Sequence, residues 1–126
     1  MITLREARTQ DLEALVRFNL AMARETEALS LDLEVLRRGV RAVLGDSGKG
    51  RYFVAEWRGA IAGALLVTYE WSDWRNAAFW WIQSVFVEPE RRRTGIFTAL
   101  YRYVEELAAG AGACGLRLYL HESNTR

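Results

Sequence analysis

The stretch QSVFVEPERRRTGIFTALYRYVEEL, residues 83–107, decides how the rest of the sequence is interpreted. It begins as an apolar strand, breaks at Pro89, and passes through three arginines and Gly95 into an amphipathic helix. A helix N-terminus leaves its first N–H groups without intrahelical partners and carries partial positive charge, and a glycine lets the backbone approach a bulky anion. The junction is therefore typical of a phosphate site, although a turn glycine beside solvated arginines would give the same pattern.

The bulk composition is that of an ordinary globular domain. The 126 residues are 51% hydrophobic and 26% charged, which is enough to bury a core and argues against disorder. A formal net charge of +1 gives no electrostatic case for nucleic acid. The single cysteine, Cys114, forms no intrachain disulfide, and the N-terminus lacks the apolar segment of a signal peptide. No apolar run reaches the length of a membrane span. We therefore expect a cytoplasmic protein without a nucleic-acid or membrane partner.

Periodicity and turn residues predict the remaining elements. Alternating or apolar runs indicate strands, and apolar residues at helical spacing indicate helices. Helices are expected from Leu12, with Thr9 as N-cap, from the residue after Asp32, and over Thr94–Ala109. The predicted strands cover residues 2–7, 51–57, 61–71, 78–87 and 116–121. The order β-α-α-β-β-β-α-β predicts one mixed α/β domain over residues 1–126.

The segment around Gly95 resembles motif A of the GNAT superfamily, the acetyl-CoA-dependent N-acetyltransferases. In that motif a strand, the loop Arg/Gln-x-x-Gly-x-Gly/Ala and a helix follow one another. Residues 92–97, RRTGIF, match it except at Phe97, which stands where the family has a small residue. The element order also matches the first elements of the family, so the resemblance covers almost the whole chain. It implies a GNAT-like sheet that is short at its C-terminal end.

The resemblance also implies a reaction and a cofactor. The acetyl group of acetyl-CoA would pass to a primary amine of a small molecule or peptide by direct attack in a ternary complex, without a metal. Backbone groups of Val85 and Val87 would pair with the pantetheine arm as an added strand does. Amides from Arg92 to Phe97 would hold the pyrophosphate. The implied cofactor-binding residues are Val85, Phe86, Val87, Arg92, Arg93, Thr94, Gly95, Ile96, Phe97 and Asn124.

Two departures from the family pattern concern Phe97 and the end of the chain. The Phe97 ring would either block the phosphates or point into the core with Leu100 and Val104, and the core is favoured because the phosphate needs only the amide. The family continues past Asn124 with a helix, whose tyrosine often protonates the thiolate of coenzyme A, and with two strands. This sequence ends at Arg126.

These departures lead to two expectations. A last strand with an unpaired edge and an exposed apolar patch would favour a homodimer or strand exchange. The missing acid and Phe97 support an alternative function, a catalytically impaired acyl-CoA-binding or sensing module that acts through a partner.

The reaction needs a general base within reach of the amine, directly or through water. The leading candidate is Glu70, at the end of a central strand beside Trp71, where burial would raise the pKa of a carboxyl group. A salt bridge from Glu70 to Arg75 is the structural alternative. Tyr119 is a weaker candidate for the missing acid. The other candidate bases are Asp73, His121 and Glu122.

Four of the five tryptophans lie between residues 71 and 81. Trp80 and Trp81 are adjacent in a strand and must face opposite sides of the sheet, so at most one of them lines a pocket. Trp71 and Trp74 flank a polar turn, where they would either pack the hairpin or stack on an aromatic or cationic amine. The candidate substrate-binding residues are therefore Trp71, Trp74 and Trp81.

Overall fold

The computed structural model describes residues 2–27 and 30–118. Each element predicted within these residues is present at close to its predicted position, and the α/β class is confirmed. The strands are β1 (Ile2–Glu6), β2 (Arg51–Trp57), β3 (Ala60–Ser72), β4 (Ala77–Val87) and β5 (Gly115–Leu118). The helices are α1 (Leu12–Glu27), α2 (Leu33–Gly45) and α3 (Ile96–Gly110). Two short 3-10 helices cover Thr9–Asp11 and Pro89–Arg91.

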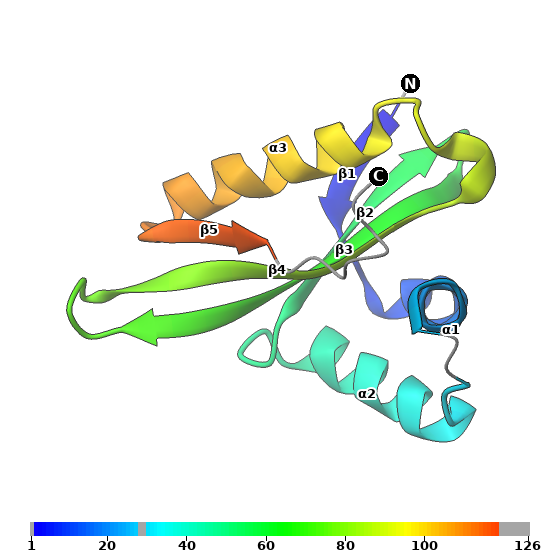
Figure 1. The fold of residues 1–126 in the computed structure, drawn as a ribbon, viewed down its shortest axis with the longest axis horizontal. Helices are drawn as coiled ribbons and strands as arrows, with labels where there is room; N and C mark the ends of the chain where they lie inside the picture. The colour runs from blue at the N-terminus through cyan, green and yellow to red at the C-terminus, as the bar shows by residue number, and fades with distance from the viewer. Residues whose placement is uncertain (1, 28–29, 119–126) are drawn as a thin grey trace.

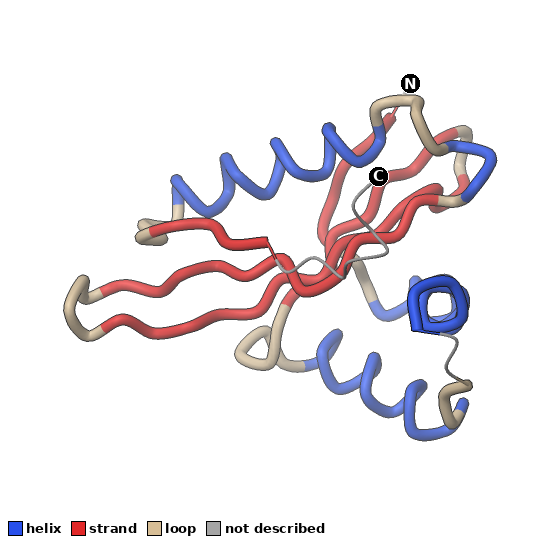
Figure 2. Tube along the Cα trace, viewed as in Figure 1, coloured by secondary structure: helices blue, strands red, loops and turns tan. Residues whose placement is uncertain are grey.

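The sheet has the order β1-β2-β3-β4-β5. Neighbouring strands from β1 to β4 pair antiparallel through short turns, whereas β4 and β5 pair parallel. A parallel pair needs a crossover connection, and α3 supplies it on one face of the sheet. Helices α1 and α2 lie on the other face (Figures 1 and 2). The chain is therefore three layers thick.

Both faces of the sheet are covered, so strand β2 is buried without interruption between Tyr52 and Ala55. Side chains that point to the α3 face pack with Leu100 and Val104, and those on the opposite face pack with Leu15 and Phe18. Gly63 fixes how closely α3 approaches the sheet. A Cβ there would lie 3.0 Å from Ile96 Cγ2, in the first turn of α3. The glycine therefore places the N-terminus of α3 directly against β3.

The start of α1 differs from the prediction. Thr9 lies inside a 3-10 helix and does not cap α1, so the predicted N-cap is wrong. Asp11, the last residue of this 3-10 helix, holds its start in place. The Asp11 carboxylate accepts a hydrogen bond from the backbone N–H of Arg8 at 2.7 Å and forms an ion pair with Arg5 at 2.8 Å. Arg5 also pairs with Glu56 of β2 at 2.6 Å. Asp11 is only 5% exposed. The Arg5 guanidinium lowers the pKa of Asp11, with burial opposing the shift.

Strands β3 and β4 continue beyond the end of β2 as an arm, and β5 lies alongside β4 for part of its length (Figure 1). The last residue of β3 paired with β2 is Val67, whereas β3 and β4 stay paired as far as Ser72 and Ala77. Strand β5 lies beside the arm-side half of β4. The two halves of β4 therefore have different neighbours.

Candidate functional site

Strand β4 changes its pairing at Gln83. Leu66 is opposite Ser84 and Val67 is opposite Ile82, so Gln83 is an extra residue, a β-bulge. The described residues of β5, which end at Leu118, pair in parallel with β4 residues 79–82. Among the described residues, the part of β4 from Gln83 onward pairs only with β3. The bulge therefore lies immediately after the last β4 residue that pairs with the described part of β5.

After the bulge, the backbone groups of two valines point away from β3. The N–H of Glu88 donates to the carbonyl of Ala62 at 2.9 Å, which makes Val87 and Gly63 a non-hydrogen-bonded pair of the ladder. By alternation the N–H and C=O of Val85 also point away from β3. Phe86, between the two valines, directs its backbone to β3, and its ring packs against Phe18 with centroids 5.0 Å apart. Backbone groups of Val85 and Val87 thus point away from β3, where a ligand could bond to them. Phe86 holds this part of β4 in place by pairing with β3 and packing against Phe18.

The loop between β4 and α3 has two residues in the left-handed region. Arg93 has φ 67° and Gly95 has φ 91°. A Cβ on Gly95 would meet nothing within 4 Å, so the loop is open on that side. The amide of Ala99 makes the first regular helical bond, to the Gly95 carbonyl at 2.9 Å. The preceding amides therefore lie at the open end of the helix, as an anion site requires.

The three arginines of the loop have different contacts. The Arg91 guanidinium lies 3.6 Å from the centroid of the Trp57 ring. Arg92 donates from Nε to the Val87 carbonyl at 2.8 Å and pairs with Glu25 of α1 at 3.0 Å. Arg93 is exposed and makes no hydrogen bond, ion pair or ring contact within residues 2–27 and 30–118. Only Arg93 leaves its charge free at the rim of the loop.

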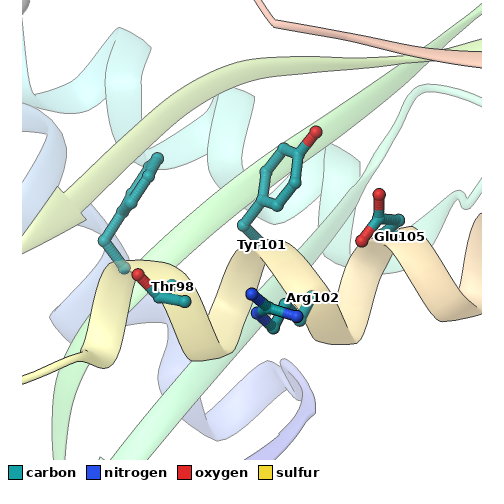
Figure 3. Close-up of a pocket in the computed structure, with 5 residues that line it drawn as sticks. Thr98, Tyr101, Arg102 and Glu105 are labelled. Atoms are coloured by element: carbon teal, nitrogen blue, oxygen red, sulfur yellow. The ribbon is translucent and has the colours of Figure 1, made fainter.

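The expected core position of Phe97 is wrong. Its side chain is 44% exposed and stacks on Tyr101 with centroids 6.4 Å apart. Ile96 and Leu100 face the core instead, because successive helical turns bring every fourth residue onto one side. The exposed side of α3 carries a shallow pocket of about 360 Å³, and Figure 3 shows the side chains that line it. The lining residues are Phe97, Thr98, Tyr101, Arg102 and Glu105.

Glu70 lies on the arm and is half exposed, so the burial expected there is absent. Its Oε1 atom accepts the indole N–H of Trp81 at 2.7 Å and a hydrogen bond from Arg117 Nη1 at 3.3 Å. The structural alternative of a salt bridge is therefore correct in kind, but the partner is Arg117 of β5. Arg75 donates to the Ser72 hydroxyl at 3.4 Å.

The structure separates the three candidate tryptophans. Trp81 faces the side opposite the buried Trp80, as predicted. Trp71 and Trp74 are 64% and 91% exposed near the tip of the arm. Trp71 is opposite Ala78, five residues from the bulge, or about 16 Å along the strand. Of these tryptophans, Trp81 lies nearest to the bulge.

Two polar residues beside the bulge were not predicted as site residues. The side-chain amide of Gln83 donates to the Thr68 hydroxyl at 2.8 Å. Thr68 is opposite Trp81 in the ladder, and both lie on the sheet face that α1 and α2 cover. A glutamine inside the apolar strand AFWWIQSVFV was the available signal. Gln83, Thr68, Trp81 and Glu70 form a row that leads from the bulge onto the arm, here called the polar row.

Of the remaining candidates, Asp73 is exposed in the turn between β3 and β4, and Tyr119, His121, Glu122 and Asn124 lie outside the described residues. Within the described part of the chain, no three His, Cys, Asp or Glu side chains are grouped to hold a metal. Among the same residues, no helix combines the length and apolar character needed to cross a membrane.

Comparison with known proteins identifies the family. The profile of the acetyltransferase (GNAT) family matches residues 13–126. A solved structure of a possible acetyltransferase from Clostridium difficile 630 is 44% identical, with a TM-score of 0.92, over 99% of this chain and 83% of that one. The chain therefore belongs to the GNAT acetyltransferase family. None of the curated proteins matches it.

More distant structures share the fold alone. A ribosomal-protein-alanine N-acetyltransferase from Brucella melitensis biovar Abortus 2308 is 13% identical with a TM-score of 0.81, over 97% of this chain and 82% of that one. The aminoglycoside acetyltransferase meta-AAC0020 from an uncultured soil metagenomic sample, solved with sisomicin, is 16% identical with a TM-score of 0.77. That match covers 98% of this chain and 80% of that one.

Proposed function

We propose that this chain transfers the acetyl group of acetyl-CoA to a primary amine by direct attack in a ternary complex. Family membership supports acetyl transfer and the use of acetyl-CoA. The observation that carries the proposal is the backbone geometry of β4 after the bulge. There the outward backbone groups of Val85 and Val87 lead toward the left-handed loop at Gly95 and the free amides of α3. A linear ligand with an amide-containing arm and a diphosphate would match both features at once.

In this proposal the thioester lies at the bulge, between the part of β4 that binds the pantetheine of coenzyme A and the polar row. We assign the acceptor amine to the side of Gln83 and Trp81, because these polar and aromatic groups are the nearest accessible ones on that face. Glu70 is opposite Phe79, four residues from the bulge, or about 13 Å along the strand. A base at that distance acts through water, so we propose Glu70 as a base connected to the amine by a water chain.

The Val87 carbonyl is already occupied by Arg92. Of the groups that the resemblance implied for the pantetheine arm, the N–H and C=O of Val85 and the N–H of Val87 are the ones that remain to bind it. The pantetheine of coenzyme A would therefore form its hydrogen bonds mainly with the backbone of Val85. Val85 is therefore the main proposed contact, with the N–H of Val87 as a second one.

The first experiment is a titration of the protein with coenzyme A and with acetyl-CoA, followed by calorimetry and thermal unfolding. A ligand that binds only the folded state stabilises it by RT ln(1 + [L]/Kd), so we expect a concentration-dependent rise in Tm. An unchanged Tm up to millimolar ligand, with no heat of binding, would overturn the proposal.

Turnover is tested separately with a panel of amines and detection of released thiol. The panel includes an aminoglycoside and a peptide that begins with alanine, the substrates named for two proteins of the same fold. Acetylation of any member supports the enzyme. Tight coenzyme A binding with no turnover across a broad panel would support the cofactor-sensing alternative, which no described contact favours at present. The homodimer and the cytoplasmic location stay predictions, and size-exclusion chromatography tests the former.

A further inference from the structure

The three consecutive arginines before Gly95 differ in what their guanidinium groups contact. Arg91 lies over the Trp57 ring, which Arg58 approaches as well, at 4.3 Å from the ring centroid. Arg92 joins two separate parts of the fold, the last carbonyl of β4 at Val87 and the carboxylate of Glu25 in α1. Its side chain also crosses the Phe86 ring at 5.2 Å. Arg91 and Arg92 therefore both have partners in other elements of the fold.

The loop needs such anchoring because Arg93 adopts φ 67°, a conformation that non-glycine residues rarely take. Strained backbone of this kind persists only where the surrounding structure holds it. The Thr94 hydroxyl donates to the Arg91 carbonyl, and this bond lies within the loop. Arg91 connects the loop to β2 through the Trp57 ring, and Arg92 connects it to the end of β4 at Val87 and to α1 at Glu25.

We propose that Arg92 is a positioning residue for the phosphate-binding loop and that Arg93 is the cation of the run that faces the bound phosphates. Arg92 acts through the backbone. Its hydrogen bonds to Val87 and Glu25 hold the end of β4 in a fixed position relative to α1, and this orients the N–H groups of residues 95–98 toward the ligand. Arg93, with no partner among the described residues, supplies charge at the rim. The inference deepens the proposed function and rests on it.

The geometry explains why the positioning residue is an arginine. Arg92 uses Nε toward Val87 and Nη2 toward Glu25, two donors in one rigid plane that point to different acceptors. A lysine keeps the charge but has a single ammonium group, which cannot hold both acceptors in this geometry. Replacement by lysine therefore separates positioning from charge.

The test compares Arg92→Lys with Arg93→Lys and Arg93→Gln, using coenzyme A as the probe and calorimetry over a range of salt concentrations. Arg92→Lys should raise the Kd of coenzyme A about tenfold, the loss of one good charge-assisted contact, with an unchanged salt dependence of log Kd. Arg93→Lys should stay within about twofold of the wild type. Arg93→Gln should raise Kd about threefold and flatten the salt dependence, because a screened charge has been removed.

Arg37→Lys is the matched control. The Arg37 guanidinium also donates two hydrogen bonds, both to the Glu13 carboxylate, at 3.0 and 3.2 Å, and this pair joins α2 to α1. It should leave the Kd of coenzyme A unchanged even where its Tm falls as far as that of Arg92→Lys. If Arg92→Lys does not fold, Glu25→Gln replaces it and should raise Kd about threefold.

The outcomes distinguish this inference from the proposed function. Wild-type affinity in both Arg92→Lys and Glu25→Gln, or a flattened salt dependence in Arg92→Lys, would overturn the positioning role while coenzyme A binding by the wild type still stands. Failure of the wild type to bind coenzyme A would overturn the proposed function and this inference with it.

Discussion

The two halves of strand β4 contribute to the site in opposite ways. In the half next to β5, residues 79–82, the backbone is paired on both sides, and the side chains of Phe79 and Trp81 face accessible surface. In the half after Gln83, Phe86 and Val87 are buried, and the backbone groups of Val85 and Val87 point away from β3. One strand thus offers side-chain chemistry before the bulge and backbone chemistry after it.

This difference indicates which half of β4 is suited to select the acceptor and which half is suited to bind the cofactor. Side chains vary between proteins while backbone groups do not, so the first half is suited to select an acceptor and the second to bind a cofactor common to a family. Substitutions in the second half should therefore change packing more than binding. The following predictions test that division, beginning with the largest effect.

Gly95→Val should nearly abolish coenzyme A binding, with Kd raised by more than about 30-fold. A β-branched residue is strongly disfavoured at φ 91°, so the loop would have to refold and its amides would turn away from the phosphates. The measurement is the Kd by calorimetry. Gly45→Val is the control, because Gly45 lies in an open position at the end of α2 and its φ is not positive. Wild-type affinity in Gly95→Val would exclude the loop as the phosphate site.

Asp11→Asn should lower the free energy of unfolding at pH 7 by roughly 2 kcal/mol and leave the Kd of coenzyme A unchanged, because the network with Arg5 lies in neither half of β4. Arg5 lowers the pKa of Asp11 below its ordinary value of 3.8. The stabilisation is therefore fully present above that value and is lost as pH falls through it toward the lower folded-state pKa.

Urea unfolding of wild type and variant between pH 3 and 7 measures this effect. The difference between the two proteins should shrink as the solution becomes more acidic. A difference that stays constant down to pH 3 would contradict the assignment of the charged form of Asp11 to the network.

Trp81→Phe should change the KM or kcat for the acceptor several-fold at an unchanged Kd for coenzyme A. The substitution keeps an aromatic ring but removes the indole N–H that holds Glu70 at 2.7 Å. Steady-state kinetics with the amine found by the panel measures it, and Trp74→Phe at the tip of the arm serves as the control. A rise in the Kd of coenzyme A, with KM and kcat for the acceptor unchanged, would show that the half of β4 before the bulge binds the cofactor, contrary to the proposed division.

Val85→Ala should have the smallest effect on binding, a change in Kd of less than about twofold, although it should cost about 1 kcal/mol of stability through lost packing. The ligand is expected to bond to the backbone of Val85, and the substitution leaves that backbone in place. Calorimetry and urea unfolding give the two numbers. A tenfold loss of affinity at full stability would mean that the side chain, and not the backbone, meets the ligand.

Local pattern was sufficient for the elements and for the family. Alternation and helical spacing depend on neighbours within a few residues, so the strands and helices were predicted close to their observed bounds. The run from Arg92 to Phe97 is also local. It led to the prediction of a phosphate loop and to the GNAT resemblance, and the comparisons bear out the resemblance. The opposite orientations of Trp80 and Trp81 followed from strand geometry alone.

Tertiary structure decided which side chains are available at the site. Arg92 is bound by Glu25, 67 positions away, and Glu70 is bound by Arg117, 47 positions away, so neither pairing leaves a trace in local sequence. Phe97 faces outward because Gly63 brings Ile96 against the sheet, and the bulge at Gln83 exists only in the register between two strands. The sequence determined what each segment is, because that depends on near neighbours. Contacts between distant segments determined what each residue is free to do.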